Sequence, residues 1–288
     1  MTYKRTFTEA FYDDYGQREW LRLEPARPYG SLQSIIHCDF VHRYVKPGDR
    51  VLDAGSGPGR FASEMAKAGA KVTLLDVSSK QLELARVTFQ LNGIEDKAQG
   101  FVHGDICDLA KFPDGAFNVT VCFGGALSYV CEKRFQAAAE LVRVTAPGGI
   151  ILVSVMSLLG SALNILYAAK MLEDPQSTAF GKPGFFDVLS HGDLDLTDAP
   201  SKQPPMHLYR SDELKALFGE CALVEAAGSN VTIRPHSPGL NEIAANAKAW
   251  ATVVEFERRA CTSPGMIECG DHLIMVFRRK VPAQHNPT

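Results

Sequence analysis

Residues 51–60 read VLDAGSGPGR, an apolar run that ends in Asp53 and continues into a loop with a glycine at every second position. The apolar run predicts a buried β-strand. Gly55, Gly57 and Gly59 predict a tight turn whose backbone can approach a ligand closely, because glycine has no Cβ and tolerates positive φ angles. A helix expected directly after the loop would point its free N–H groups at the same place, so an anionic group of a ligand could be held there.

The spacing of the glycines distinguishes this loop from the dinucleotide-binding fingerprint. That fingerprint, G-x-G-x-x-G, would need a glycine where Arg60 stands, and the pattern here is G-x-G-x-G. A glycine loop taken alone is a weak signal, and a purely structural tight turn is its alternative interpretation. The assignment of a ligand site therefore depends on what surrounds the loop.

The segments on either side of the loop alternate between strand and helix patterns, which predicts a parallel sheet covered by helices. Right-handed crossovers between the strands give the doubly wound α/β plan, in which ligands bind beyond the carboxyl ends of the strands. We expect strands at residues 71–76, 100–105, 117–123 and 147–155, and helices at residues 32–45, 61–68, 80–91 and 133–145. The glycine loop would then lie at the ligand-binding edge of the sheet.

Two further carboxylates fall at the ends of expected strands. Asp76 ends the second strand, where it could accept hydrogen bonds from both hydroxyls of a ribose and would repel a 2′-phosphate, which argues against NADP. Asp105 ends the third strand, where it could accept from an adenine amino group while Ile106 packs on the ring. Either aspartate alone could be a helix cap or a loop residue. Together with Asp53 they occupy three consecutive strand ends, which favours an adenosine-containing ligand.

Composition excludes several classes of partner. The chain has 30 lysines and arginines against 33 aspartates and glutamates, a formal net charge of -3, and no basic cluster, so we expect no nucleic-acid partner. The N-terminal segment lacks the apolar run of a signal peptide, and no stretch approaches the roughly 20 apolar residues of a membrane span. We therefore expect no membrane partner and a cytoplasmic location. The seven cysteines contain no C-x-x-C pair, which predicts reduced thiols.

At these motifs the sequence resembles the class I S-adenosylmethionine-dependent methyltransferases, in their small-molecule branch. VLDAGSGPGR resembles the first motif of that family, VTLLDVS its acidic second-strand end, HGDI its adenine-contacting aspartate, and ELVRVTAPGGIILVSV its later helix and strand. The resemblance covers roughly residues 30–156. It implies a Rossmann-like sheet of seven mostly parallel strands whose last strand, residues 272–279, is antiparallel. It also implies S-adenosyl-L-methionine as the cofactor, S-adenosyl-L-homocysteine as the product and no metal.

By position, the cofactor contacts of that family fall on three parts of this chain. The glycine loop would flank the methionine end of the cofactor, the second strand end would hold the ribose, and the third would hold the adenine. Phe123 could pack against the cofactor, the core or the acceptor. The expected cofactor-binding residues are Asp53, Ala54, Gly55, Ser56, Gly57, Gly59, Asp76, Val77, Gly104, Asp105, Ile106 and Phe123.

The alternation of strand and helix lapses from Met156 to His207, which indicates an insertion. Its apolar helix, residues 157–172, either covers an apolar acceptor as a lid or lies on the sheet as an ordinary amphipathic helix. Further on we expect a strand near residues 228–233 and a helix at about 241–259, where the family often has only a short hairpin. The expected division is an N-terminal helical cap at 1–48, a cofactor-binding core at 49–156, an inserted lid or substrate segment at 157–207, the C-terminal half of the sheet at 208–280 and a disordered tail at 281–288.

The segment after the fourth strand, CFGGALSYV, lacks the Pro-Pro-aromatic motif typical of methyltransferases that modify nucleic-acid amino groups or glutamine amides. Gly124 and Gly125 leave room for a substrate. We therefore expect methyl transfer to an oxygen, nitrogen or carbon of a small organic acceptor, and we leave a homodimer open. The alternatives are a methyltransferase that modifies tRNA or protein and, from another class, an NAD-type oxidoreductase or a non-catalytic sensor of an adenosine ligand.

A histidine is the side chain best suited to take a proton from the acceptor near neutral pH. His207, in PPMHLYRSDEL, stands where the insertion returns to the sheet, and in an extended segment its side chain would share a face with that of Tyr209. We expect His207 as the base and Tyr209 as the residue that orients the acceptor. A loop histidine bound to a backbone carbonyl is the alternative. The remaining candidates are His37, His191, His236 and His272.

Overall fold

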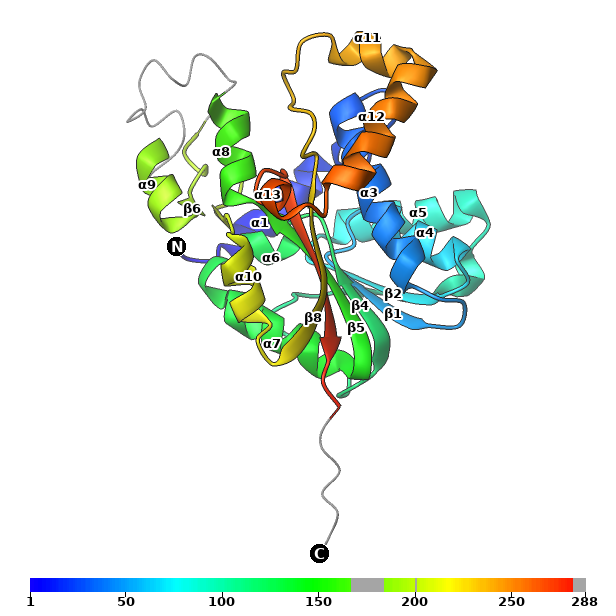
Figure 1. Cartoon of the computed structure of the whole chain (residues 1–288). Helices are drawn as coiled ribbons and strands as arrows, with labels where there is room; N and C mark the ends of the chain where they lie inside the picture. Colours follow the sequence, from blue (N-terminus) through cyan, green and yellow to red (C-terminus); the bar gives the residue numbers. More distant parts are fainter. Residues whose placement is uncertain (167–183, 200, 282–288) are drawn as a thin grey trace, which may run out of the picture.

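A computed structural model of the chain describes residues 1–166, 184–199 and 201–281. Its centre is a seven-stranded sheet in the order β3-β2-β1-β4-β5-β9-β8, flanked by helices on both faces (Figure 1). The strands are β1 (Arg50–Ala54), β2 (Lys71–Asp76), β3 (Ala98–His103), β4 (Phe117–Cys122), β5 (Thr145–Met156), β8 (Cys221–Ser229) and β9 (His272–Arg279). The pairs among β1 to β5 are parallel, and β9 is antiparallel to both of its neighbours. The expected fold class, including the antiparallel last strand, is confirmed.

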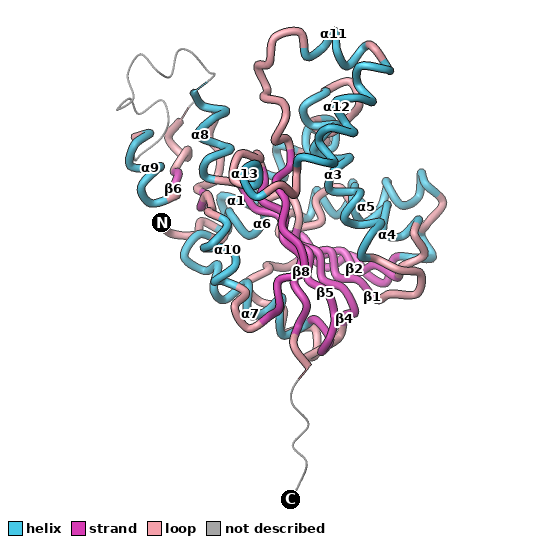
Figure 2. The backbone as a smooth tube through the Cα atoms, in the orientation of Figure 1, coloured by secondary structure: helices cyan, strands magenta, loops and turns pink. Residues whose placement is uncertain are grey.

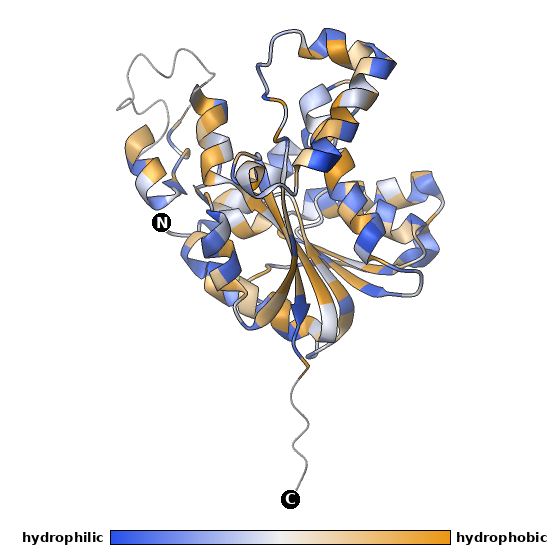
Figure 3. Ribbon diagram, in the orientation of Figure 1, coloured by the Kyte–Doolittle hydropathy of each residue, from blue (hydrophilic) through white to orange (hydrophobic). Residues whose placement is uncertain are grey.

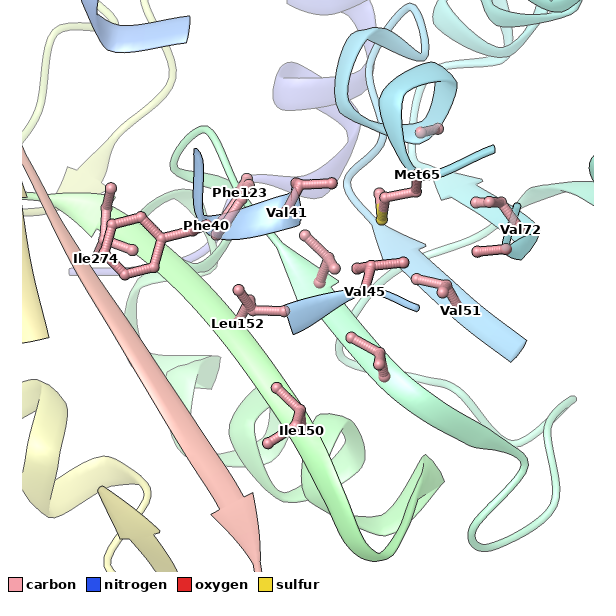
Figure 4. Close-up of a cluster of buried hydrophobic side chains, with 14 of the residues drawn as sticks. Phe40, Val41, Val45, Val51, Met65, Val72, Phe123, Ile150, Leu152 and Ile274 are labelled. Carbon is pink, nitrogen blue, oxygen red and sulfur yellow. The ribbon is translucent and has the colours of Figure 1, made fainter. Parts of the chain in front are cut away.

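Two hydrophobic cores lie on opposite faces of the sheet because alternate residues of each strand point to opposite sides. One core joins strand residues such as Val51 and Leu152 to α3 (Pro28–Tyr44), α4 (Arg60–Lys67) and α5 (Ser79–Asn92) (Figure 4). The other joins Leu52 and Val153 to α7 (Arg134–Val144) and α10 (Ser211–Leu217). Hydrophobic residues run along the middle of the strands, and most hydrophilic residues lie on the surrounding helices, although α8 is largely hydrophobic (Figure 3).

The N-terminal residues form α1 (Arg5–Tyr15) and α2 (Arg18–Leu21), which precede α3. Short elements connect the strands: η1 (Glu95–Lys97), α6 (Ala126–Tyr129), η2 (Cys131–Lys133) and α13 (Pro264–Ile267). The tube in Figure 2 shows helices on either side of the strands, with the sheet running between them. Because β1 to β5 are parallel, the loops that follow their carboxyl ends all lie at the same edge of the sheet.

The insertion begins and ends beside β5. Tyr209 donates its backbone N–H to the carbonyl of Met156 at 2.8 Å and accepts from the N–H of Leu158 at 2.8 Å, which joins the two ends of the segment. Its described part holds α8 (Leu158–Leu166), α9 (Phe185–His191) and the antiparallel pair of β6 (Asp193–Leu194) and β7 (Met206–His207). The helix expected at residues 157–172 is described only as far as residue 166, and residues 282–288 of the expected tail also lie outside the described residues.

Two expected elements near the C-terminus are corrected. The strand expected at residues 228–233 is β8, which ends at Ser229, because Asn230 turns the chain with a φ of 61°. Asparagine is one of the few residues that adopt this conformation readily. The helix expected at residues 241–259 is two helices, α11 (Leu240–Ala245) and α12 (Ala247–Ala260), because the side chain of Asn246 caps the second one. These helices pack against α3 and leave the order of the strands unchanged.

Candidate functional site

The glycine loop joins β1 to α4 at the carboxyl edge of the parallel strands. Gly55, Gly57 and Gly59 have φ angles of 84°, 51° and 80°, a region that residues with a Cβ rarely adopt. The backbone N–H groups of Gly55 and Ser56 donate to the carbonyl of Leu75 at 2.8 and 3.0 Å. The loop is therefore fixed against the end of β2 before any ligand arrives.

Asp76 links the two strand ends through its carboxylate. Its Oδ2 accepts from the N–H of Gly57 at 2.7 Å, and its Oδ1 accepts from the N–H of Ser78 at 2.8 Å. The residue is only 7% exposed, and burial raises the pKa of its carboxyl to about 6. Each oxygen keeps lone pairs beyond the one that the backbone uses, so the carboxylate can still accept hydrogen bonds from a ligand.

Asp53 lies behind the loop, 2% exposed. Its Oδ2 has no hydrogen-bond partner among the described residues, and burial together with the nearby Asp76 raises the pKa of its carboxyl to about 7. It does not line the cavity, and neither does Ala54 or Gly59. A Cβ on Gly59 would lie 3.2 Å from the Cβ of Ala85, so this glycine allows α5 to pack closely on the loop. The structure thus places these three residues outside the lining of the cavity, and direct ligand contact by them stays a prediction.

Asp105 is held at the third strand end by the N-terminal segment. Its Oδ2 accepts from the hydroxyl of Tyr3 at 3.0 Å and lies 3.7 Å from Nε of Arg5, while its Oδ1 accepts from the N–H of Cys107 at 2.9 Å. Ile106 is buried beside it and lines the same cavity. Of these partners, Tyr3 and Arg5 were not expected from the sequence.

The N-terminal segment is tied down over the strand ends. Arg60, the residue that breaks the dinucleotide fingerprint, lies 4.0 Å from the centre of the Trp20 ring and donates to the Trp20 carbonyl at 2.7 Å. On the other side, Ser78 Oγ donates to Asp13 at 2.5 Å, and the side chain of Gln81 donates to the carbonyl of Tyr12 at 3.0 Å. These contacts join residues far apart in the sequence, which explains why local pattern analysis missed them.

A cavity lies between the strand ends and this N-terminal segment, with about 840 Å³ of empty space when the part open to solvent is included. The predicted residues that line it are Gly55, Ser56, Gly57, Asp76, Val77, Gly104, Asp105, Ile106 and Phe123. The residues of the N-terminal segment that line it are Tyr3, Thr8, Tyr12, Glu19, Arg22 and Leu23. The aromatic and charged residues in FYDDY and REWLR are the sequence signal that could have indicated this second wall.

A second cavity adjoins the first, with about 1660 Å³ of empty space when the part open to solvent is included. The two have Tyr12, Glu19, Arg22, Gly124 and Tyr129 in common as lining residues. Glu19 and Arg22 form a half-buried ion pair in this shared wall, with Nε of Arg22 at 2.8 and 2.9 Å from the two carboxylate oxygens. The site therefore has two compartments with a largely charge-neutral wall between them.

The second cavity reaches the start of β9. Asp271 and His272 line it together with Tyr29, Gln33 and Met156. Among the expected alternatives to His207, His272 is thus the histidine that the structure brings to the site. His37 is buried close by, with its ring centre 5.6 Å from that of His272.

His207 and Tyr209 occupy a different place. His207 is 3% exposed, and its Nδ1 and Nε2 lie 2.7 and 2.6 Å from carboxylate oxygens of Asp193 and Glu213. The Tyr209 hydroxyl donates to the carbonyl of Leu127 at 3.1 Å. The centres of the two rings lie 4.8 Å apart, so the two side chains are neighbours as expected. Neither residue lines either cavity. Both ring nitrogens of His207 are therefore engaged by carboxylates, and the structure does not bring this histidine to either cavity.

Comparison with known proteins agrees with this geometry. Residues 51–149 match the family model described as a methyltransferase domain. The chain carries a class I S-adenosylmethionine-dependent methyltransferase domain. The family resemblance inferred from the glycine loop and the strand-end aspartates is thereby confirmed.

Several curated methyltransferases are similar to part of this chain. Malonyl-[acyl-carrier protein] O-methyltransferase of Serratia marcescens is 36% identical over 38% of this chain and 40% of its own length. Ubiquinone biosynthesis O-methyltransferase of Xanthomonas campestris pv. campestris is 31% identical over 49% and 56%. The chain spans about half the length of the curated relatives it matches.

Among solved structures, a similar fold is that of 1,6-didemethyltoxoflavin-N1-methyltransferase of Burkholderia thailandensis, which contains its acceptor and S-adenosylhomocysteine. It has a TM-score of 0.56 and 15% identity, over 96% of this chain and 87% of the other. A methyltransferase of Methanosarcina mazei has a TM-score of 0.55 and 18% identity, over 84% and 97%. At these identities the likeness supports the fold.

The methyltransferase domain has a donor set that fits the cofactor. Asp76 and Asp105, at the ends of β2 and β3, have carboxylate oxygens with free lone pairs, which a ribose and an adenine amino group require as acceptors. The glycines of the loop, with their positive φ angles, have no side chains that would fill the space beside them. Within the described ranges, there is no group of histidine, cysteine, aspartate and glutamate side chains arranged to hold a metal ion. No described helix is long and apolar enough to cross a membrane.

Proposed function

We propose that this protein transfers a methyl group from S-adenosylmethionine to a small organic acceptor. The observation that carries the proposal is the pair of adjoining cavities, which meet at Gly124 and Tyr129. The first has the strand-end carboxylates suited to an adenosine, and the second is lined mainly by aromatic and polar side chains. Similar proteins that include a ubiquinone biosynthesis O-methyltransferase and 1,6-didemethyltoxoflavin-N1-methyltransferase support a small acceptor.

When bound, the cofactor supplies a methyl group activated on a sulfonium. In this proposal the residues of the chain bind and orient. Asp76 accepts hydrogen bonds from the ribose, and Asp105 accepts from the adenine with Tyr3 holding its second oxygen in place. The N-terminal segment covers the cavity and keeps water from the reacting atoms, which strengthens electrostatic interactions inside it. Positioning of the two reactants in adjoining compartments is the main catalytic contribution.

The inserted segment contacts the acceptor side of the site. Gln203 lines the second cavity, and Asn164 of α8 donates to Tyr29 and Asp271, which also line it. No described residue of the insertion lines the first cavity. We therefore propose that this segment shapes acceptor binding and leaves cofactor binding alone. We also propose a cytoplasmic location, and we leave open whether the protein forms a homodimer.

The test is a thermal-shift comparison of S-adenosylhomocysteine, NAD and NADP, because a ligand that binds the native state raises the midpoint by mass action. S-adenosylhomocysteine alone should raise it. A shift with NAD alone would instead support the oxidoreductase alternative. Transfer of an isotope-labelled methyl group to small molecules, tRNA and protein then separates the acceptor classes, and label found only in tRNA or protein would overturn the small-acceptor proposal.

A further inference from the structure

The direction of β9 brings two ionisable side chains to the acceptor compartment. His272, the first residue of β9, pairs with Met156 at the end of β5 and with Ser229 at the end of β8. Because β9 runs opposite to its neighbours, its N-terminal end lies at the edge where the parallel strands have their carboxyl ends. Asp271 and His272 therefore lie at the same edge of the sheet as the cofactor loop, and both line the second cavity.

The imidazole of His272 is buried and has a ring nitrogen without a hydrogen-bond partner among the described residues. The residue is 3% exposed, and its Nδ1 has no partner among the described residues. Its Nε2 lies 3.9 Å from Oδ2 of Asp271, which is longer than a hydrogen bond. Burial, with the nearby Arg22, lowers the pKa of His272 to about 3, so the ring is neutral at neutral pH. With the proton on Nε2, the free lone pair is on Nδ1.

Asp271 is held in place from behind. Asn164 donates to its Oδ1 at 2.8 Å and to the hydroxyl of Tyr29 at 2.9 Å. The helix that carries Asn164 can approach this closely because a Cβ on Gly160 would lie 1.8 Å from the carbonyl oxygen of Gly270, the residue before Asp271. A fixed carboxylate beside Nε2 would stabilise an imidazolium. Such hydrogen bonds are often long in unliganded sites and shorten when the substrate binds.

The walls of the second cavity favour a flat and uncharged ligand. The aromatic side chains that line it are Phe11, Tyr12, Tyr15, Tyr29 and Tyr129. Of its charged residues, Arg22 pairs with Glu19 and Arg27 is exposed to solvent. Asp271 lies on the buried side, where burial raises the pKa of its carboxyl and the nearby Arg22 and Arg234 oppose that rise. A carboxylate at the buried end would meet this negative charge, whereas an aromatic ring would pack against aromatic side chains.

We propose that the second cavity binds a planar, uncharged aromatic acceptor with its hydroxyl on Nδ1 of His272, and that His272 takes the hydroxyl proton while Asp271 stabilises the imidazolium. This rests on the proposed methyl transfer. The acceptor oxygen forms a bond to the methyl carbon as the carbon–sulfur bond of the donor breaks, with the electron pair left on sulfur. The proton moves from the oxygen to Nδ1 and then to water. The positive charge lost at sulfur reappears on the imidazole, so the charge of the site is conserved.

The first test uses ligand binding without turnover. The protein is saturated with S-adenosylhomocysteine and titrated calorimetrically with 2-naphthol, naphthalene and 2-naphthoate, which share one ring system. We expect 2-naphthol to bind about tenfold more tightly than naphthalene, since it satisfies the buried Nδ1, and 2-naphthoate to bind most weakly. Equal affinities for 2-naphthol and naphthalene, or a preference for 2-naphthoate, would overturn the inference.

The second test assigns the preference to His272. His272→Phe keeps a ring at this position and should bind 2-naphthol and naphthalene equally, while His272→Gln retains an acceptor oxygen and should keep part of the preference. His191→Gln, an exposed histidine of α9 remote from both cavities, is the matched control and should behave as wild type. An unchanged preference in His272→Phe would overturn the proposal.

The outcomes separate the two proposals. Absence of S-adenosylhomocysteine binding in the wild-type protein would overturn the proposed function and this inference with it. Normal S-adenosylhomocysteine binding without the preference for 2-naphthol would overturn this inference alone. Binding of S-adenosylhomocysteine also shows that each variant is folded, and if His272→Phe fails to fold, the ligand series on the wild-type protein still decides.

Discussion

Replacing Asp53 with asparagine should stabilise the ligand-free protein at pH 8 but not at pH 4.5. The Asp53 carboxyl is buried behind the glycine loop, its Oδ2 lacks a partner among the described residues, and burial and Asp76 raise its pKa from 3.8 to about 7. A carboxyl whose pKa is raised on folding contributes stability below its unfolded value, and that contribution is lost as the pH rises through the folded value. The wild-type protein should therefore lose stability between about pH 4 and pH 7, and the variant should lose less.

The size of this effect follows from the pKa. One pKa unit corresponds to about 1.4 kcal/mol, so a rise from 3.8 to about 7 corresponds to about 4 kcal/mol when the carboxyl is fully ionised. The amide of asparagine brings N–H donors into the same buried place, and a buried donor without a partner costs about 1 to 3 kcal/mol. The net stabilisation at pH 8 should be about 1 to 3 kcal/mol. At pH 4.5 the variant should be equal to the wild type or less stable.

The assay is the urea midpoint of unfolding at several pH values without ligand. The quantity that matters is the difference between variant and wild type, because the other titrating groups then cancel. Asp198→Asn replaces an exposed carboxylate and serves as the control, with a difference that stays constant with pH. A difference between Asp53→Asn and wild type that also stays constant between pH 4.5 and pH 8 would refute the reasoning.

Three further predictions concern the cofactor cavity and His207, which lies outside both cavities. Asp76→Ala should weaken S-adenosylhomocysteine binding at least about tenfold in calorimetry, because charge-assisted hydrogen bonds are lost; unchanged affinity in the folded variant would contradict the ribose assignment. Gly57→Val should abolish that binding, since the φ of 51° disfavours a branched residue, and wild-type affinity would mean that the loop is only structural. His207→Gln should lower the thermal midpoint, because its contacts with Asp193 and Glu213 are lost, yet keep the rate of methyl transfer; a rate loss of about a hundredfold without loss of stability would restore a base at His207.

The cofactor half of the site could be predicted from the sequence because its signals are local. The apolar run before Asp53, the G-x-G-x-G spacing and an aspartate at each following strand end are readable within short windows, and the parallel sheet brings consecutive strand ends together. Gly55, Gly57, Asp76 and Asp105 accordingly meet at one cavity. The same reasoning could not tell that Gly59 faces α5, because that depends on packing between elements.

The acceptor half could not be predicted in this way. His207 was favoured because it stands at the end of the insertion. In the structure its two ring nitrogens contact Asp193 and Glu213, which lie on other elements, so the sequence around His207 did not reveal these contacts. His272 is the first residue of β9, and the antiparallel direction of this strand was expected. Its position beside Met156 depends in addition on the pairing of β9 between β5 and β8, which the sequence did not show. The N-terminal wall with Tyr3 and Arg22 was not predicted either, because the aromatic and charged residues of that segment do not show by themselves which part of the sheet they cover.

The sequence alone determined the alternation of strands and helices, the glycine loop and the acidic strand ends, because each of these depends on backbone geometry and periodicity over a few neighbouring residues. The tertiary structure decided which side chains lie in the site: it closed the N-terminal segment over the loop through Arg60 and Trp20, paired Arg22 with Glu19, and left Nδ1 of His272 without a partner. Such outcomes depend on contacts between residues far apart in the chain, whose partners and burial exist only after the sheet has assembled.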